Sequence, residues 1–83
     1  MNKSQKELYE KIVNILVEKF EQDESKLSLN TNIIKDLDFD SLDIAELYTR
    51  LEKHLDLRER ASVLQLANIR TIEDIIDLAM KLQ

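Results

Sequence analysis

The 83-residue chain contains no cysteine, no glycine and no proline, and it has a single histidine. Without cysteine it can form no disulfide, thiol nucleophile or thiolate metal site, and one histidine leaves no partner for a histidine-based zinc site. β-Hairpin turns depend strongly on glycine, so its absence argues against an all-β fold, whereas helices tolerate it well. No two groups have the spacing of a nucleophile and its base, so we expect that the protein is not an enzyme.

Long hydrophobic runs are also missing. The apolar cluster around residues 12–17 is too short and too interrupted to span a bilayer, and the first ten residues lack the apolar core of a signal peptide. We therefore expect a cytoplasmic protein without membrane insertion. A chain of this length supplies one hydrophobic core at most, so residues 1–83 are expected to form a single, monomeric domain.

The net charge of −5 is concentrated in the middle of the chain. Residues 1–35 carry six acidic and six basic side chains and residues 57–83 carry four of each, whereas residues 36–56 carry seven acids against two bases. An acidic surface repels the phosphates of nucleic acids and of anionic lipids. We therefore expect no nucleic-acid partner, and we expect basic protein surfaces to be the natural partners.

Capping signals and helical periodicity predict the first and last helices. Ser4 and Glu7 have the spacing of a capping box, and apolar residues follow at helical spacing, which predicts a helix over about residues 4–20. Thr71, with Asp74 three residues later, is the expected N-cap of the last helix. The residues expected to be buried on that last helix are Ile72, Ile75, Ile76, Ala79 and Leu82.

The middle of the chain combines a long loop with two further elements. A second helix is expected over about residues 41–55, and a short turn or helix over 59–67. The buried stripe of the second helix is expected to consist of Ile44, Leu47, Tyr48, Leu51 and Leu55. Residues 21–40 show no period, but their six apolar side chains predict a loop that packs across the bundle. Together these elements predict an all-α fold, a small four-helix bundle with three long helices, one short helix and a long first loop.

A serine lies where the long loop ends and the second helix begins, within the segment Asp36-Leu37-Asp38-Phe39-Asp40-Ser41-Leu42-Asp43. Serine is a common N-cap, so its position alone would make Ser41 a structural cap. The start of a helix also presents unpaired N–H groups and the positive end of the helix dipole, and it therefore stabilises an attached phosphate. A hydroxyl exposed there can be esterified without disturbing the core.

This segment resembles the attachment motif of the acyl carrier protein family, Asp-Leu-Gly-x-Asp-Ser-Leu, which continues into an acidic second helix. The matching positions are Asp36, Leu37, Asp40, Ser41, Leu42 and Asp43, and Glu46 and Leu47 follow at the family spacing. The resemblance extends over most of the chain, from the first helix to the final Thr-Ile-Glu-Asp helix. It implies that Ser41 carries 4′-phosphopantetheine, transferred from coenzyme A by a phosphopantetheinyl transferase.

By this resemblance, the chain would hold acyl intermediates as thioesters for fatty acid, polyketide or related lipid biosynthesis. It would present them to acyl-transferring and acyl-modifying enzymes with basic docking surfaces. The implied recognition face consists of Asp36, Asp38, Asp40, Leu42, Asp43, Ala45, Glu46 and Thr49. Two departures, Asp38 in place of the family's glycine and no Ile-Pro within residues 56–70, suggest a specialised carrier rather than the housekeeping one.

Three other interpretations remain open at the level of the residues. A peptidyl or D-alanyl carrier would share the fold and the serine, and an acidic helical module could bind basic partners without any prosthetic group. Asp36, Asp38 and Asp40 also have the 1, 3, 5 spacing of an EF-hand calcium loop. That loop requires glycine at its sixth position and glutamate at its twelfth, where this chain has Ser41 and Leu47, so we expect no metal site.

Overall fold

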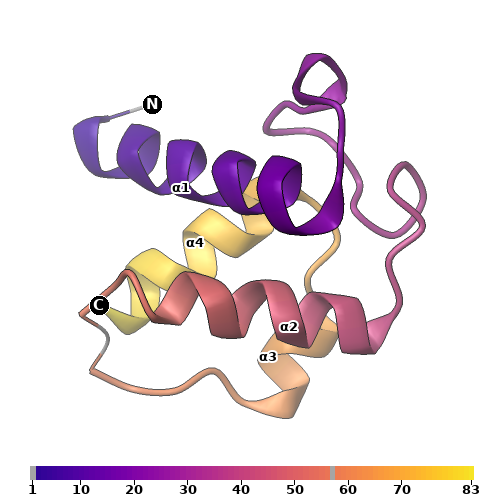
Figure 1. The fold of residues 1–83 in the computed structure, drawn as a ribbon. Helices are drawn as coiled ribbons and strands as arrows, with labels where there is room; N and C mark the ends of the chain where they lie inside the picture. The colour runs from indigo at the N-terminus through magenta and orange to yellow at the C-terminus, as the bar shows by residue number, and fades with distance from the viewer. Residues whose placement is uncertain (1, 57) are drawn as a thin grey trace.

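Four α-helices and one 3₁₀ turn make up the regular structure of the computed structural model, which describes residues 2–56 and 58–83 (Figure 1). The elements are α1 (Lys3–Phe20), η1 (Glu24–Lys26), α2 (Ser41–Glu52), α3 (Val63–Ala67) and α4 (Ile72–Leu82). The part of the chain so described contains no strand, only an isolated antiparallel bridge between Asn32 and Thr71. This arrangement confirms the predicted four-helix bundle with three long helices, one short helix and a long first loop.

The N-cap predicted for α1 is wrong. The helix begins at Lys3, and its cap is Asn2 rather than Ser4. Asn2 and Gln5 form a reciprocal capping box, in which each backbone N–H donates to the other residue's side-chain oxygen at 2.9 and 2.8 Å. Asn-x-x-Gln satisfies the same two N–H groups as Ser-x-x-Glu, and here it does so two residues earlier in the chain.

At its other end, α1 closes with a residue in the left-handed conformation. Glu21 has a φ of 56°, and its N–H, like that of Gln22, donates to the carbonyl of Leu16. Glycine usually fills this position because it has no Cβ to clash, but the chain contains none. Glu21 therefore adopts a conformation that is unfavourable for a residue with a side chain.

The second helix begins at Ser41 as predicted but ends at Glu52 rather than at Leu55. Beyond Glu52 the N–H groups of His54 and Leu55 donate to carbonyls three residues earlier, so the last turn tightens into 3₁₀-type bonding. Leu55 nevertheless packs, half-buried, against the core. The rest of the predicted stripe is buried, namely Ile44, Leu47, Tyr48 and Leu51.

The two C-terminal helices follow their capping residues. Thr71 caps α4 and forms a capping box with Asp74, and all five predicted core residues of that helix are buried. The short helix occupies only part of the predicted range 59–67, because its cap is Ser62. Within the described residues, no helix is long and apolar enough to cross a membrane. The cytoplasmic location and the monomeric state stay predictions.

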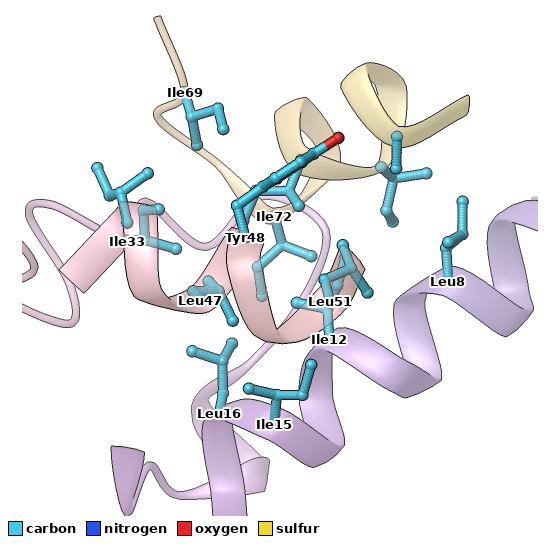
Figure 2. Close-up of a cluster of buried hydrophobic side chains, with 14 of the residues drawn as sticks. Leu8, Ile12, Ile15, Leu16, Ile33, Leu47, Tyr48, Leu51, Ile69 and Ile72 are labelled. Atoms are coloured by element: carbon cyan, nitrogen blue, oxygen red, sulfur yellow. The ribbon is translucent and has the colours of Figure 1, made fainter. Parts of the chain in front are cut away.

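The core is formed where α1 packs against α2 and α4 (Figure 1). Figure 2 shows Ile12 and Leu16 of α1 facing Leu47 and Leu51 of α2, and each of these four side chains is fully buried. The long loop joins this core as predicted: three of its apolar residues, Leu27, Ile33 and Phe39, are buried, and the other three pack against the cluster. The loop is therefore fixed in place, and with it the start of α2.

Candidate functional site

A tight turn opens the segment that leads to Ser41. The side-chain oxygen of Asn32 accepts hydrogen bonds from the N–H groups of Ile34 and Lys35, at 3.0 and 2.9 Å. The Asp36 carboxylate accepts one from the N–H of Asn32 at 2.9 Å, and the Asp36 N–H donates to the Asn32 carbonyl at 2.7 Å. Asp36 therefore supports the loop, although its side chain is exposed.

Two further anchors fix the last residues before the helix. Asp38 has a φ of 59°, in the left-handed region where the related motif has glycine and where aspartate is one of the better-tolerated residues. Phe39 is buried, its ring centroid lies 4.9 Å from that of Phe20, and its N–H donates to the carbonyl of Ile33 at 3.0 Å. The left-handed residue turns the chain so that Phe39 enters the core and Asp40 emerges from it.

The N-cap of α2 is Asp40, not Ser41. The Asp40 carboxylate accepts from the N–H of Asp43 at 2.9 Å, and the Asp43 carboxylate accepts from the N–H of Asp40 at 3.0 Å. This capping box corrects the interpretation of Ser41 as a structural cap. The Ser41 side chain is exposed, and its hydroxyl forms no hydrogen bond within the described residues. The hydroxyl is therefore available for covalent modification.

The free N–H groups at the start of α2 favour a phosphate on this hydroxyl. The N–H groups of Asp43 and Ile44 are bonded to Asp40, whereas those of Ser41 and Leu42 have no acceptor in the part of the chain that the structure describes. Unbonded N–H groups and the helix dipole attract an anion to the first turn of a helix. The residues present thus fit an anionic group esterified to Ser41.

An apolar pocket of about 470 Å³ opens beside Ser41, between the start of α2 and α3. Its lining residues are Ile34, Phe39, Asp40, Ser41, Ile44, Ala45, Val63, Leu66, Ala67 and Arg70. The contribution of α3 could not be predicted from the sequence, because a five-residue helix is too short to show an apolar period. Only the structure shows that the apolar side chains of Val63 and Leu64 on this helix are exposed (84% and 76%).

The structure separates the predicted recognition face into two groups. Leu42 is 77% exposed, and Asp36, Asp38, Asp40, Glu46 and Thr49 are exposed as well. Asp43 and Ala45 are half-buried, one in the capping box and the other in the wall of the pocket. Nowhere in residues 2–56 and 58–83 do three or more acidic or histidine side chains form a group that could hold a metal ion. The recognition role of this face stays a prediction.

Comparison with known proteins gives the family. Residues 10–79 match the family described as phosphopantetheine attachment site. The chain is 39% identical over 70 residues to an acyl carrier protein of Syntrophus aciditrophicus, which covers 84% of this chain and 85% of that protein. It is 41% identical over 51 residues to an acyl carrier protein of Picosynechococcus, covering 61% of this chain and 63% of that protein. It is 39% identical over 49 residues to one of Lactobacillus acidophilus, covering 59% of this chain and 61% of that protein.

The chain therefore belongs to the acyl carrier protein family, the phosphopantetheine-attachment proteins. The match to the Picosynechococcus and Lactobacillus proteins spans about three fifths of their length, and the match to the Syntrophus protein spans most of it. Family membership confirms covalent 4′-phosphopantetheine as the cofactor.

Proposed function

We propose that Ser41 carries the 4′-phosphopantetheine arm and that the chain holds acyl intermediates on it as thioesters. One observation carries this proposal. Ser41 lies within the matched region, at the first position of α2, with an exposed hydroxyl that the helix cap does not use. When bound, the arm supplies a terminal thiol to which an acyl group is joined as a thioester.

The residues around Ser41 have separable tasks in this function. The capping box of Asp40 and Asp43 holds the first turn of α2, which leaves the serine hydroxyl free. The N–H groups of Ser41 and Leu42 and the helix dipole favour the negative charge of the phosphodiester. The arm is thus attached to a rigid element rather than to a mobile loop.

The adjoining pocket favours acyl over aminoacyl cargo. Ile44, Val63 and Leu66 contribute to its largely apolar lining. Each methylene group that leaves water for such a surface contributes about 0.8 kcal/mol. The ammonium group of an aminoacyl cargo would instead pay a desolvation cost there. This contrast supports a carrier for fatty acid, polyketide or related lipid biosynthesis rather than a peptidyl or D-alanyl carrier.

The proposed partners are a phosphopantetheinyl transferase and acyl-handling enzymes with basic docking surfaces. Leu42 and Glu46 are exposed on the first two turns of α2, next to Ser41, and Thr49 follows on the third turn. An exposed apolar side chain with flanking carboxylates suits a basic surface that has an apolar centre. Since charge steers such encounters, their rates are expected to fall as the salt concentration rises.

The intact mass of the protein tests this function. After incubation with coenzyme A and a broad-specificity phosphopantetheinyl transferase, the wild-type chain should gain one phosphopantetheine group. The Ser41→Ala variant should gain none. The Ser4→Ala variant is the matched control, because Ser4 is also an exposed serine in the first turn of a helix and should leave loading unchanged. A wild-type chain that never becomes heavier, or an S41A variant that does, would refute the proposal.

A further inference from the structure

Arg70 is the cationic residue in the lining of the pocket beside Ser41. The residue as a whole is exposed, although it contributes to that lining. A long basic side chain can lay its apolar stem along such a wall and keep its charged end in water. An exposed arginine in such a wall is thus expected to keep its guanidinium at the edge of the pocket.

The backbone of Arg70 is connected to the segment that positions Ser41. The N–H of Ile33 donates to the carbonyl of Arg70 at 2.8 Å, and the N–H of Phe39 donates to the carbonyl of Ile33 at 3.0 Å. The neighbouring residue, Thr71, pairs with Asn32 in the isolated bridge. Two successive hydrogen bonds thus join Arg70 to a residue only two positions before Ser41.

The guanidinium of Arg70 is held in one orientation. Its Nη1 donates to the carbonyls of Ala67 and Ile69, at 2.6 and 2.9 Å. These two bonds use both hydrogens of Nη1 and leave the donors of Nε and Nη2 unassigned. Within the described residues, no carboxylate lies within 4.0 Å of this guanidinium. Its remaining donors thus have no protein anion to pair with.

From this placement we propose that Arg70 binds an anionic group carried on Ser41, through the N–H donors of Nε and Nη2. The inference rests on the proposed function of Ser41. Two sources could supply the anion, the phosphodiester of the arm itself or a carboxylate at the end of a dicarboxylic acyl cargo. Arginine suits both, because its planar donors match the oxygens of phosphate and of carboxylate.

Arg70 would offset a repulsion that the rest of the site creates. A phosphodiester on Ser41 adds negative charge beside Asp40 and Asp43 and within a segment that carries the whole net charge of −5. Exposed ion pairs of this kind shift an equilibrium by about two- to fivefold at low salt. The expected effect on the arm is therefore a measurable bias in its position, not tight fixation.

Nuclear magnetic resonance of the loaded protein tests the proposal without a mutation. On conversion of the apo protein to the loaded form, the Nε–H resonance of Arg70 should shift, and added salt should reverse the shift. The ³¹P resonance of the phosphodiester should differ between the wild type and Arg70→Gln, with Arg70→Lys between them. Arg60→Gln is the matched control, because Arg60 is an exposed arginine outside this pocket and should leave the ³¹P resonance unchanged.

Three loaded forms distinguish the two sources of the anion. If the phosphodiester is bound, the Arg70 shift is already complete with the bare arm and is the same with butyryl and succinyl cargo. If a cargo carboxylate is bound, the shift appears only with succinyl cargo. If Arg70 serves only to cap α3, its Nε–H resonance is the same in the apo and all three loaded forms, which would overturn the inference. Loading is confirmed by mass in each case, so a chain that takes no arm refutes the proposed function of Ser41 instead.

Discussion

The Tyr48 hydroxyl offers the sharpest test of the packing. Tyr48 is only 2% exposed and lies in the middle of α2, and its hydroxyl has no hydrogen-bond partner in the part of the chain that the structure describes (Figure 2). A buried polar group without a partner costs about 1–3 kcal/mol relative to its hydration in the unfolded chain. Replacement by phenylalanine removes that group and keeps the ring, so Tyr48→Phe should stabilise the fold.

The expected gain at pH 7 is about 1 kcal/mol, because the small void left by the oxygen cancels part of the benefit. For a domain of this size such a gain raises the melting temperature by about 4–8 °C. Tyr9→Phe is the matched control with the opposite expectation. The Tyr9 hydroxyl donates to the carbonyl of Leu27 at 3.2 Å, so its removal should cost about 0.5–1.5 kcal/mol.

The same hydroxyl makes stability depend on alkaline pH. Burial, and after it the nearby carboxylate of Glu52, raises the pKa of Tyr48 from 10.0 to about 12 in the folded protein. Between these values the unfolded chain loses its proton while the folded one keeps it. Through this group the free energy of unfolding is therefore constant below pH 10 and falls by about 1.4 kcal/mol per pH unit as the pH rises from 10 to 12. Tyr48→Phe should lack this loss.

Urea unfolding followed by circular dichroism at pH 7 and pH 11 measures both effects. The wild type should lose more free energy of unfolding between these pH values than Y48F does, by about 1 kcal/mol. The reasoning is refuted if Y48F is less stable than the wild type at pH 7 and the two proteins lose the same amount at pH 11. That result would show that the hydroxyl has a favourable partner in solution.

Three further changes test the capping and the surface. Glu21→Gly should raise the free energy of unfolding by about 0.5–1 kcal/mol, because Glu21 has a positive φ. Glu18→Gly, inside α1, is the control and should lower that free energy by about 1 kcal/mol. Urea unfolding measures both effects. Asp38→Gly should be at least as stable as the wild type, whereas Asp38→Val should lose about 1–2 kcal/mol of unfolding free energy in the same assay. Equal stabilities of the two variants would contradict the left-handed backbone of Asp38. Glu46→Lys should slow loading of the arm in the mass assay. The free energy of unfolding should change by at most about 0.5 kcal/mol, because Glu46 is exposed and its ion pair with Arg50 is loose at 3.8 Å. Unchanged loading kinetics would remove Glu46 from the proposed recognition face.

The sequence predicted the helices well where a single capping pattern was available. The predictions of the Thr71 cap and of the buried stripe of α4 are correct because the capping box and the apolar stripe indicate the same helical register. At the N-terminus two capping patterns overlap, Asn2 with Gln5 and Ser4 with Glu7, and local chemistry does not distinguish them. The end of α2 was placed too late because Leu55 continues the apolar period although the backbone has already tightened.

The pocket could not be predicted in the same way. Ser41 was singled out because the loop, the helix start and the family motif all coincide within a few residues. The opposite wall comes from Val63, Leu66 and Arg70, more than twenty positions later in the chain. Their meeting depends on the tertiary packing of α3 against α2, for which the short helix has no periodic signal. Asp38 was singled out in the sequence, but only the structure gives its left-handed backbone as the physical reason that the related motif has glycine.

The acids around Ser41 have a structural function besides the recognition role proposed for them, and the sequence alone does not separate the two. Asp36 bonds to the N–H of Asn32, and Asp40 and Asp43 bond to each other's N–H groups, so these three carboxylates hold the loop and the start of α2 in place. Charge reversal at any of them would change stability together with the proposed recognition, so it would not test that recognition alone. At Asp43 the lost capping bond alone should cost about 1 kcal/mol. Glu46 takes no part in the capping, so its reversal changes the charge that a partner meets without displacing the serine.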